Sequence, residues 1–240
     1  MGQVKIQIAK AGNSPAHAAL LSGAERARLQ AMTPENRPAF MTARGLLRIA
    51  LGRQLAMKPE DVPLLQEGAG RVTLGCRGAQ SPSFSVSHTQ SGMCGFVAVA
   101  VSDAAPIGVD IEATDRQFDW RRLASRRLSE TEQVWFSKCS DKEGREAFLK
   151  LWTLKEALVK LWDDKLLRVL AETSLDLGAL SKCRKGAALL HPSVLVPLVQ
   201  PKLPPGAGVS LCSGEITKPQ LYLGLAIQAD KELDIDIEYL

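Results

Sequence analysis

Three carboxylates and one lysine stand in two short segments whose spacing would let them meet. In residues 106–112, apolar side chains alternate with Gly108, Asp110 and Glu112, which is typical of a strand with one buried face. At a rise of about 3.3 Å per residue, Asp110 and Glu112 lie on the same face, about 6–7 Å apart.

The second segment, residues 151–160, predicts a helix that would cross this polar face. Its apolar residues recur at helical spacing, and Trp152, Glu156 and Lys160 follow at i, i+4 and i+8 along one side. If that side faces the strand, three carboxylates and one ammonium converge, and such a cluster is unstable without a cation. Hard oxygen ligands suit Mg²⁺, which water and substrate phosphates usually complete.

The two segments together resemble a known signature. G-V-D-x-E over residues 108–112, followed by W-x-x-K-E-A-x-x-K over residues 152–160, is similar to the 4′-phosphopantetheinyl transferase superfamily, specifically its long single-chain surfactin-synthetase-activating (Sfp) type. The resemblance runs from about residue 44 to residue 162. It implies an α+β fold built as a pseudo-twofold pair of similar α/β subdomains. We expect these subdomains over residues 1–105, on the coenzyme A 3′-phosphate and adenine side, and 106–240, with the metal site and catalytic helix.

The resemblance implies a reaction and a role for each polar residue. The reaction is transfer of 4′-phosphopantetheine from coenzyme A to a serine of an apo acyl or peptidyl carrier protein, with release of 3′,5′-ADP. Asp110, Glu112 and Glu156 would hold Mg²⁺, with Mn²⁺ as an alternative ion. Glu156 would act as the base, directly or through a metal-bound water, and Lys160 would stabilise charge on the phosphate. The carrier and its pathway (fatty acid, polyketide, non-ribosomal peptide or another) stay open.

Further residues are implied as coenzyme A contacts. Arg44 matches the family's helix arginine at the 3′-phosphate, and Gly70-Arg71 stands where the family has Gly-Lys-Pro near the adenine nucleotide. Lys155 would contact ligand phosphate or a neighbouring acidic group. The full predicted coenzyme A set is Arg44, Arg71, Ser87, His88, Asp110 and Lys155. Arg48 is expected at the surface, and Trp152 as a packing anchor.

Simpler interpretations accompany these predictions. Asp110 and Glu112 could merely hydrate a strand face, while Glu156 and Lys160 form a helix salt bridge worth ~0.2–0.5 kcal/mol. A protein of the same fold that binds coenzyme A or a nucleotide as a sensor, without turnover, is the alternative function. Because both motifs keep all their polar positions, the pattern favours the enzyme.

The composition of the chain argues against other functional classes, such as nucleic-acid binding. Of all residues, 45% are hydrophobic, 23% are charged and 5% are aromatic, and the net charge is +4. The sequence has basic runs, but so few aromatic residues and no recognised binding module argue against nucleic acid. Arg121-Arg122 and Arg126-Arg127 are instead a candidate docking surface for an acidic carrier protein.

The predicted location follows from what the chain lacks. No secretion signal opens the sequence, and residues 93–101, the longest apolar run, have half the length of a membrane span. The five scattered cysteines are interpreted as reduced thiols. We therefore expect a cytoplasmic monomer that does not bind membranes.

Local patterns predict most elements. We expect strands over residues 3–9, 84–88, 93–102, 107–112, 221–227 and 233–237, and a turn over residues 68–71. We expect helices over residues 17–32, from Thr33-Pro34 onward, from a capping box at 129–132, and around Trp152 after a charged loop at 141–144. Residues 93–102 and 107–112 should form a hairpin, and residues 84–88 a strand ending at His88. Residues 166–180 stay open between helix and strand, and 191–208 should be irregular with an edge strand.

Overall fold

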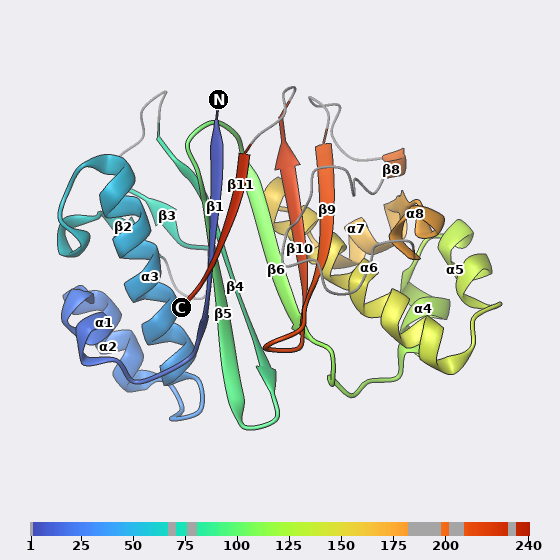
Figure 1. The fold of residues 1–240 in the computed structure, drawn as a ribbon, viewed down its shortest axis with the longest axis horizontal. Coiled ribbons are helices and arrows are strands. Elements are labelled where there is room, and N and C mark those ends of the chain that lie inside the picture. Colours follow the sequence, from blue (N-terminus) through green and yellow to red (C-terminus); the bar gives the residue numbers. More distant parts are fainter. Residues whose placement is uncertain (1, 67–70, 76–80, 182–197, 202–208, 230–233) are drawn as a thin grey trace.

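Two β-sheets form the centre of the computed structural model, with helices on both outer sides (Figure 1). The structure describes residues 2–66, 71–75, 81–181, 198–201, 209–229 and 234–240. The mixed α+β fold is confirmed and is consistent with the expected transferase fold. No helix in these ranges is long and apolar enough to cross a membrane.

The first sheet contains both ends of the chain, in the strand order β11-β1-β5-β4. Its strands are β1 (Gln3–Lys10), β4 (Ser83–Ser91), β5 (Cys94–Ser102) and β11 (Asp234–Tyr239). Strand β1 pairs antiparallel with β5 and parallel with β11. The last strand of the expected second subdomain therefore lies in the sheet of the first, and the boundary between residues 105 and 106 stays a prediction.

The second sheet carries the predicted polar strand, in the order β6-β10-β9. Its strands are β6 (Ile107–Ala113), β9 (Val209–Ile216) and β10 (Leu221–Gln228). Apolar side chains of both sheets form one core between them, including Ile6, Ala98, Val109 and Leu223. Two short pairs complete the strands, β2 (Leu64–Leu65) with β3 (Thr73–Leu74), and β7 (Thr173–Leu175) with β8 (Leu198–Pro201).

Side-chain hydroxyls join the two sheets where β4 runs beside β6. Four backbone N–H groups of β6 donate to alternate hydroxyls of β4, at 2.9–3.3 Å: Ile107 to Ser83, Val109 to Ser85, Ile111 to Ser87 and Ala113 to Thr89. Every residue of β6 is buried, so unpaired N–H groups there would be costly. The period-two hydroxyls of β4 therefore satisfy the edge of β6 that β10 does not pair.

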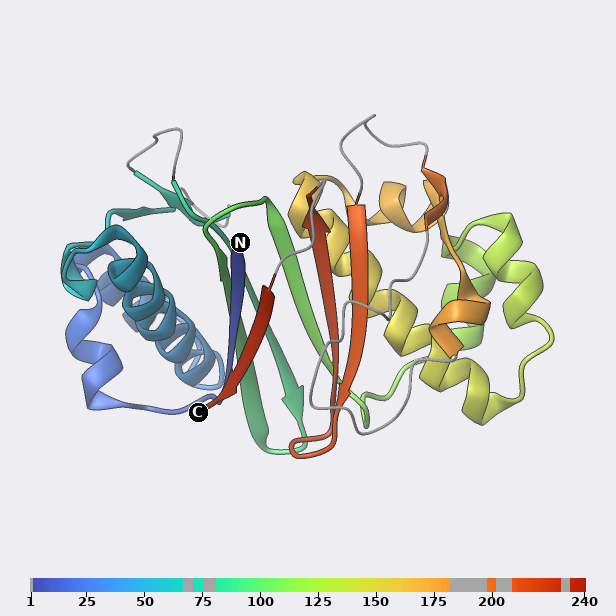
Figure 2. The ribbon, with the colours of Figure 1, turned by 45° about the horizontal axis from the view of Figure 1, so that its top comes forward.

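Helices cover the outer faces of the two sheets. Beside the first sheet lie α1 (Pro15–Leu20), α2 (Gly23–Ala31), α3 (Arg37–Leu55) and the 3₁₀ turn Pro59–Asp61. Beside the second lie α4 (Trp120–Arg127), α5 (Glu130–Phe136), α6 (Asp141–Trp162), α7 (Leu166–Glu172) and α8 (Leu177–Ser181). Helix α6 crosses β6 and β10, as Figure 2 shows from a second angle.

Three helix predictions are wrong at their boundaries. The helix expected over residues 17–32 is two helices, because Ser22 caps α2 through a capping box with Glu25. The next helix begins at Arg37, not at Thr33-Pro34. Residues 141–144 are no loop, because Ser140 and Glu143 form a capping box that opens α6.

Two strand predictions also need correction. Strands β5 and β6 form no hairpin, since they belong to different sheets. Strand β4 continues past His88 to Ser91. The open segment 166–180 contains α7, β7 and most of α8. Of the irregular stretch 191–208, only β8 lies within the described residues, while residues 68–70 of the predicted turn lie outside them.

Candidate active site

Two glycines let helix α6 lie directly on the sheet. A Cβ atom on Gly108 would stand 2.0 Å from the Ala157 carbonyl oxygen, and one on Gly224 would stand 2.7 Å from that of Thr153. Since real Cβ atoms do not approach so closely, the backbones of α6, β6 and β10 meet without intervening side chains. This contact brings the side of α6 that carries Glu156 and Lys160 next to the carboxylates of β6.

Asp110 is the most tightly held carboxylate of the cluster. Its Oδ1 accepts hydrogen bonds from Ser87 Oγ at 2.6 Å and from Lys160 Nζ at 2.8 Å. Lys160 Nζ also donates to the Val109 carbonyl oxygen at 3.0 Å. The second oxygen, Asp110 Oδ2, is buried and accepts no hydrogen bond in the described part of the chain. The predicted approach of Lys160 to Asp110 is therefore present.

The other two carboxylates are electrostatically strained. Glu112 accepts from Thr89 Oγ1 at 3.1 Å and forms an ion pair with Arg116, while burial and then Asp110 raise its pKa. Glu156 accepts no hydrogen bond from any described residue; burial first, and then Asp110, raise its pKa to about 7, while Lys160 opposes the rise. Three acids against two cations leave one negative charge unbalanced when all are ionised.

Asp110 and Glu156 can supply some, but not all, of the ligands of a cation. No three His, Cys, Asp or Glu side chains among the described residues are arranged to hold a metal ion by themselves. Mg²⁺, however, is usually bound through one or two carboxylates, with waters and substrate phosphates completing its shell. The orphaned Asp110 Oδ2 and the strained Glu156 fit that description. The full ligand set Asp110, Glu112 and Glu156 stays a prediction.

Of the two strand residues predicted to touch coenzyme A, one is engaged elsewhere. Ser87 is buried, and its hydroxyl donates to Asp110 and accepts from Ile111 N–H, so its phosphate contact stays a prediction that these bonds do not favour. His88 lies in the middle of β4 and is exposed. Partial desolvation of the ring, and then the charge of Lys160, lower its pKa, so the imidazole faces the same cluster.

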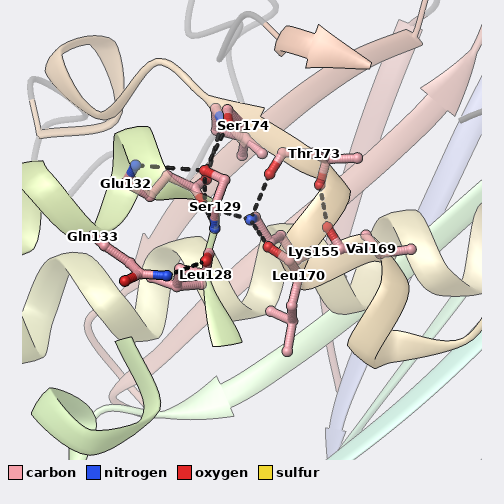
Figure 3. Close-up of polar contacts among 10 residues, drawn as sticks. Leu128, Ser129, Glu132, Gln133, Lys155, Val169, Leu170, Thr173 and Ser174 are labelled. Carbon is pink, nitrogen blue, oxygen red and sulfur yellow. Dashed lines mark hydrogen bonds and ion pairs between the residues drawn. The ribbon is translucent and has the colours of Figure 1, made fainter. Parts of the chain in front are cut away.

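Lys155 is bound inside the protein (Figure 3), and its contact with coenzyme A stays a prediction that these internal bonds do not favour. The side chain is fully buried, and Nζ donates to Glu132 at 2.6 Å and to the carbonyl oxygens of Leu170 and Thr173 at 2.8 Å each. All three N–H donors are therefore used. Lys155 was also predicted, as the alternative, to contact a neighbouring acidic group, and its ion pair with Glu132 confirms this.

Arg48, expected at the surface, is 1% exposed. Its guanidinium binds Glu25 Oε2 at 2.8 and 3.0 Å and donates to the carbonyl oxygens of the 3₁₀ turn that follows α3. Arg44 is also buried, 3.5 Å from Glu25, and donates to Gln66 beside a cavity of about 60 Å³. The 3′-phosphate role of Arg44 stays a prediction.

The remaining predicted residues lie at the margins of α6. Arg71 is half-exposed and stands 3.7 Å from Asp163, which ends α6 in a left-handed conformation with φ of 54°. Trp152 is partly buried and stacks on Phe148 with ring centroids 5.9 Å apart. Its other neighbour is the Arg116 guanidinium, at 5.9 Å from the ring. The anchoring role of Trp152 thus fits its contacts.

The sequence did not point to three residues of this region. Thr89 and Arg116 hold Glu112, and Glu132 neutralises Lys155. The alternating hydroxyls over residues 83–89 were the one usable signal for Thr89, because that period places them on one side of β4.

The comparisons with known proteins agree with this geometry. Residues 106–191, which include both motif segments, match the family model of the 4′-phosphopantetheinyl transferase superfamily. Over these residues the match supports the resemblance at the level of the superfamily, and the surfactin-synthetase-activating type stays a prediction.

Individual relatives carry the same name. The chain is 34% identical over 149 residues to 4′-phosphopantetheinyl transferase HetI of Nostoc sp. (strain PCC 7120), with 61% of each chain covered. It is 33% identical over 147 residues to the putative 4′-phosphopantetheinyl transferase slr0495 of Synechocystis sp. (strain PCC 6803), covering 61% of this chain and 58% of that one. It is 31% identical over 114 residues to 4′-phosphopantetheinyl transferase AcpT of Salmonella typhimurium, covering 47% and 54%. The match thus spans about three fifths of the first two relatives.

Proposed function

We propose that this protein transfers the 4′-phosphopantetheine group of coenzyme A to a serine of an apo acyl or peptidyl carrier protein, with Mg²⁺, as a single-chain enzyme of the surfactin-synthetase-activating type. The observation that carries the proposal is the cluster of Asp110, Glu112 and Glu156 around Lys160, on a helix seated directly on β6. The names of the relatives support the same activity.

We assign Mg²⁺ to the three carboxylates, with Asp110 Oδ2 as the oxygen free to ligate it. When bound, the ion would neutralise charge on the coenzyme A pyrophosphate as the phosphoanhydride bond breaks. It would also supply the positive charge that the cluster lacks, since Lys160 and Arg116 leave one carboxylate unbalanced.

The protein's own groups can manage the proton and the charge. The serine oxygen of the carrier forms a new bond to the phosphorus that bears pantetheine, and the bond from that phosphorus to the oxygen of 3′,5′-ADP breaks. The serine proton passes to Glu156, whose burial makes its carboxylate a stronger base by raising its pKa. Lys160 uses two donors on Asp110 and Val109, which leaves its third N–H for a phosphate oxygen.

For coenzyme A, we keep His88, Arg71, Arg44 and Asp110 as proposed contacts. His88 is exposed beside the cluster, and Arg71 reaches the end of α6. For the carrier, we propose the face of α4, on which Arg122, Arg126 and Arg127 are exposed. Reversing these charges should raise the KM for the carrier and leave the KM for coenzyme A unchanged.

Mass spectrometry of an apo carrier protein, incubated with this protein, coenzyme A and Mg²⁺, tests the proposal. A mass gain of one phosphopantetheine, on the order of 340 Da, that EDTA abolishes is the expected result. The Asp110→Ala variant should give no such gain. If several carriers gain no mass while coenzyme A still binds, the activity is wrong and a sensor of the same fold replaces it.

A further inference from the structure

A second cavity lies on the other side of helix α6 from the carboxylate cluster. It has a volume of about 470 Å³ and is enclosed by α5, α6 and α8, which Figure 1 shows at the end of the molecule away from α3. Its wall residue Lys150 precedes Glu156 by six positions, about 120° around the helix. Thr153 and Ala157, which face the sheet, lie between the two on the helix surface. The cavity is therefore separate from the candidate active site.

One wall of this cavity contains Lys150, whose side chain is largely buried and makes no hydrogen bond to the residues that the structure describes. Lys150 is 7% exposed, yet its ammonium donates no hydrogen bond to any residue that the structure describes. Its nearest acid is Glu215, at a loose 4.0 Å, and Glu215 Oε2 is itself buried without a hydrogen-bond partner in the described chain. Lys150 therefore has donors that a molecule in the cavity could use.

The charges around Lys150 decide which kind of molecule fits. The carboxylates of Glu143 and Glu146 line the cavity together with the ammonium groups of Lys138 and Lys150, and the ring of Tyr222 presents its face to Lys150 at 5.4 Å. Burial first, and then the charges of Glu215 and Glu146, raise the pKa of Tyr222. An anionic ligand would be repelled by the carboxylates and a cationic ligand by Lys138 and Lys150, whereas a neutral acceptor oxygen would be repelled by neither.

The rest of the wall is apolar in part. Trp135, Ala147 and Leu180 contribute to it, next to the charged rim residue Lys138. A cavity of a few hundred Å³ that joins apolar walls to a few polar groups is the usual form of a small-molecule site. We propose that this cavity binds a small uncharged molecule with an apolar body and a carbonyl or amide oxygen, to which Lys150 donates the orienting hydrogen bond.

Hexanamide is a suitable probe, with hexanoate and hexylammonium as its charged counterparts. Binding is followed on the full chain by the ¹H–¹⁵N signal of the Trp135 indole, assigned with Trp135→Phe. Hexanamide should shift this signal saturably, with a Kd on the order of 1 mM for so small a ligand. Both charged counterparts should bind more weakly.

Three variants sharpen the test. Lys150→Met should weaken hexanamide binding about tenfold or more. Lys138→Met, an exposed lysine on the same rim, should leave it unchanged. Ala147→Phe fills the cavity while it keeps both members of the Lys150–Glu215 pair, and it should abolish binding even if Lys150→Met fails to fold. The proposal is overturned if the wild type shows no saturable shift, if the two lysine variants bind equally well, or if hexanoate binds more tightly than hexanamide.

Discussion

Two lysines of helix α6, five positions apart, occupy opposite kinds of environment. Lys155 is fully buried with Glu132, and all three of its donors are used. Glu132 is equally engaged, since it also accepts from Ser129 and from the backbone N–H of Leu175 (Figure 3). Lys160 is partly exposed and faces three carboxylates; the pKa of two of them is raised, and one oxygen of the third is orphaned.

The different surroundings of the two lysines indicate that Lys155 has a structural role and Lys160 a functional one. Around Lys155 the charges balance and the hydrogen bonds are complete, so nothing remains for a ligand to satisfy. Around Lys160 the carboxylates are in excess, so a cation or the donors of a substrate complex would relieve their repulsion. Two adjacent motif positions, Lys155 and Glu156, thus belong to different systems, although the motif reads as one unit.

The largest expected effect on stability comes from breaking the buried ion pair between Lys155 and Glu132. Lys155→Met leaves the Glu132 carboxylate buried without its cation, and we expect a loss of about 3–5 kcal/mol in the free energy of unfolding. Chemical denaturation measures this loss. Lys142→Met, on the exposed start of the same helix, should change stability by no more than about 0.5 kcal/mol. Similar losses for both variants would show that the Lys155 pair contributes little.

The second prediction concerns the three carboxylates around Lys160. Asp110→Asn removes the acceptor charge of Lys160 and the proposed Mg²⁺ oxygen, while it relieves repulsion on Glu112 and Glu156. We expect transfer to a carrier protein to fall about 10²–10³-fold, equivalent to about 3–4 kcal/mol. The melting temperature should change little. A single-turnover assay measures the transfer rate, and thermal unfolding measures the melting temperature. The prediction is contradicted if activity survives while the melting temperature falls strongly.

The sequence predicted the strands better than their partners. Alternation identified β1, β4 and β6, since each has a face that must be buried, and a continuous apolar run identified β5. It could not reveal that β5 and β6 enter different sheets, because the turn between them looks the same whether the strands pair or diverge. Strand β9, with Ser213 and Gly214 in its middle, offers no regular alternation and was missed.

For the site, the sequence predicted which residues share a face but not their tertiary partners. The spacing of Glu156 and Lys160 was sufficient to place both beside Asp110. The environment of Lys155 depends on Glu132 and on carbonyl groups of α7 and β7. Only the packing of those elements against α6 decides that environment, and no local pattern encodes it.

The third prediction tests the contact that holds the cluster together. Gly108→Ala would force its Cβ against the Ala157 carbonyl, 2.0 Å away, and so push α6 from β6. We expect a loss of about 1–3 kcal/mol in stability and a larger loss of transfer activity, because small misplacements of catalytic groups are costly. Gly224→Ala is the matched control, with a 2.7 Å approach at Thr153, and it should be milder in both measurements.

The smallest effect is a pH dependence of stability. The pKa of Glu156 is raised from 4.5 to about 7 in the folded protein, so the folded state binds more protons than the unfolded state between these values. The cost of ionising Glu156 is therefore absent below pH 4.5, grows as the pH rises through this window, and is complete above pH 7. After allowance for partial exposure, we expect about 1–2 kcal/mol at pH 8.

Glu156→Gln removes this cost, so the stability of the variant relative to wild type should rise from pH 4.5 to pH 8. Glu60→Gln, at an exposed site, should follow the wild-type curve. Thermal unfolding at several pH values, with EDTA present, measures both. Mg²⁺ at pH 8 should then stabilise the wild type more than Glu156→Gln, because the ion compensates the same repulsion. Parallel curves of stability against pH for wild type and Glu156→Gln would mean that the negative charges around Lys160 are as well neutralised as the one beside Lys155. The electrostatic contrast between the two lysines would then be wrong.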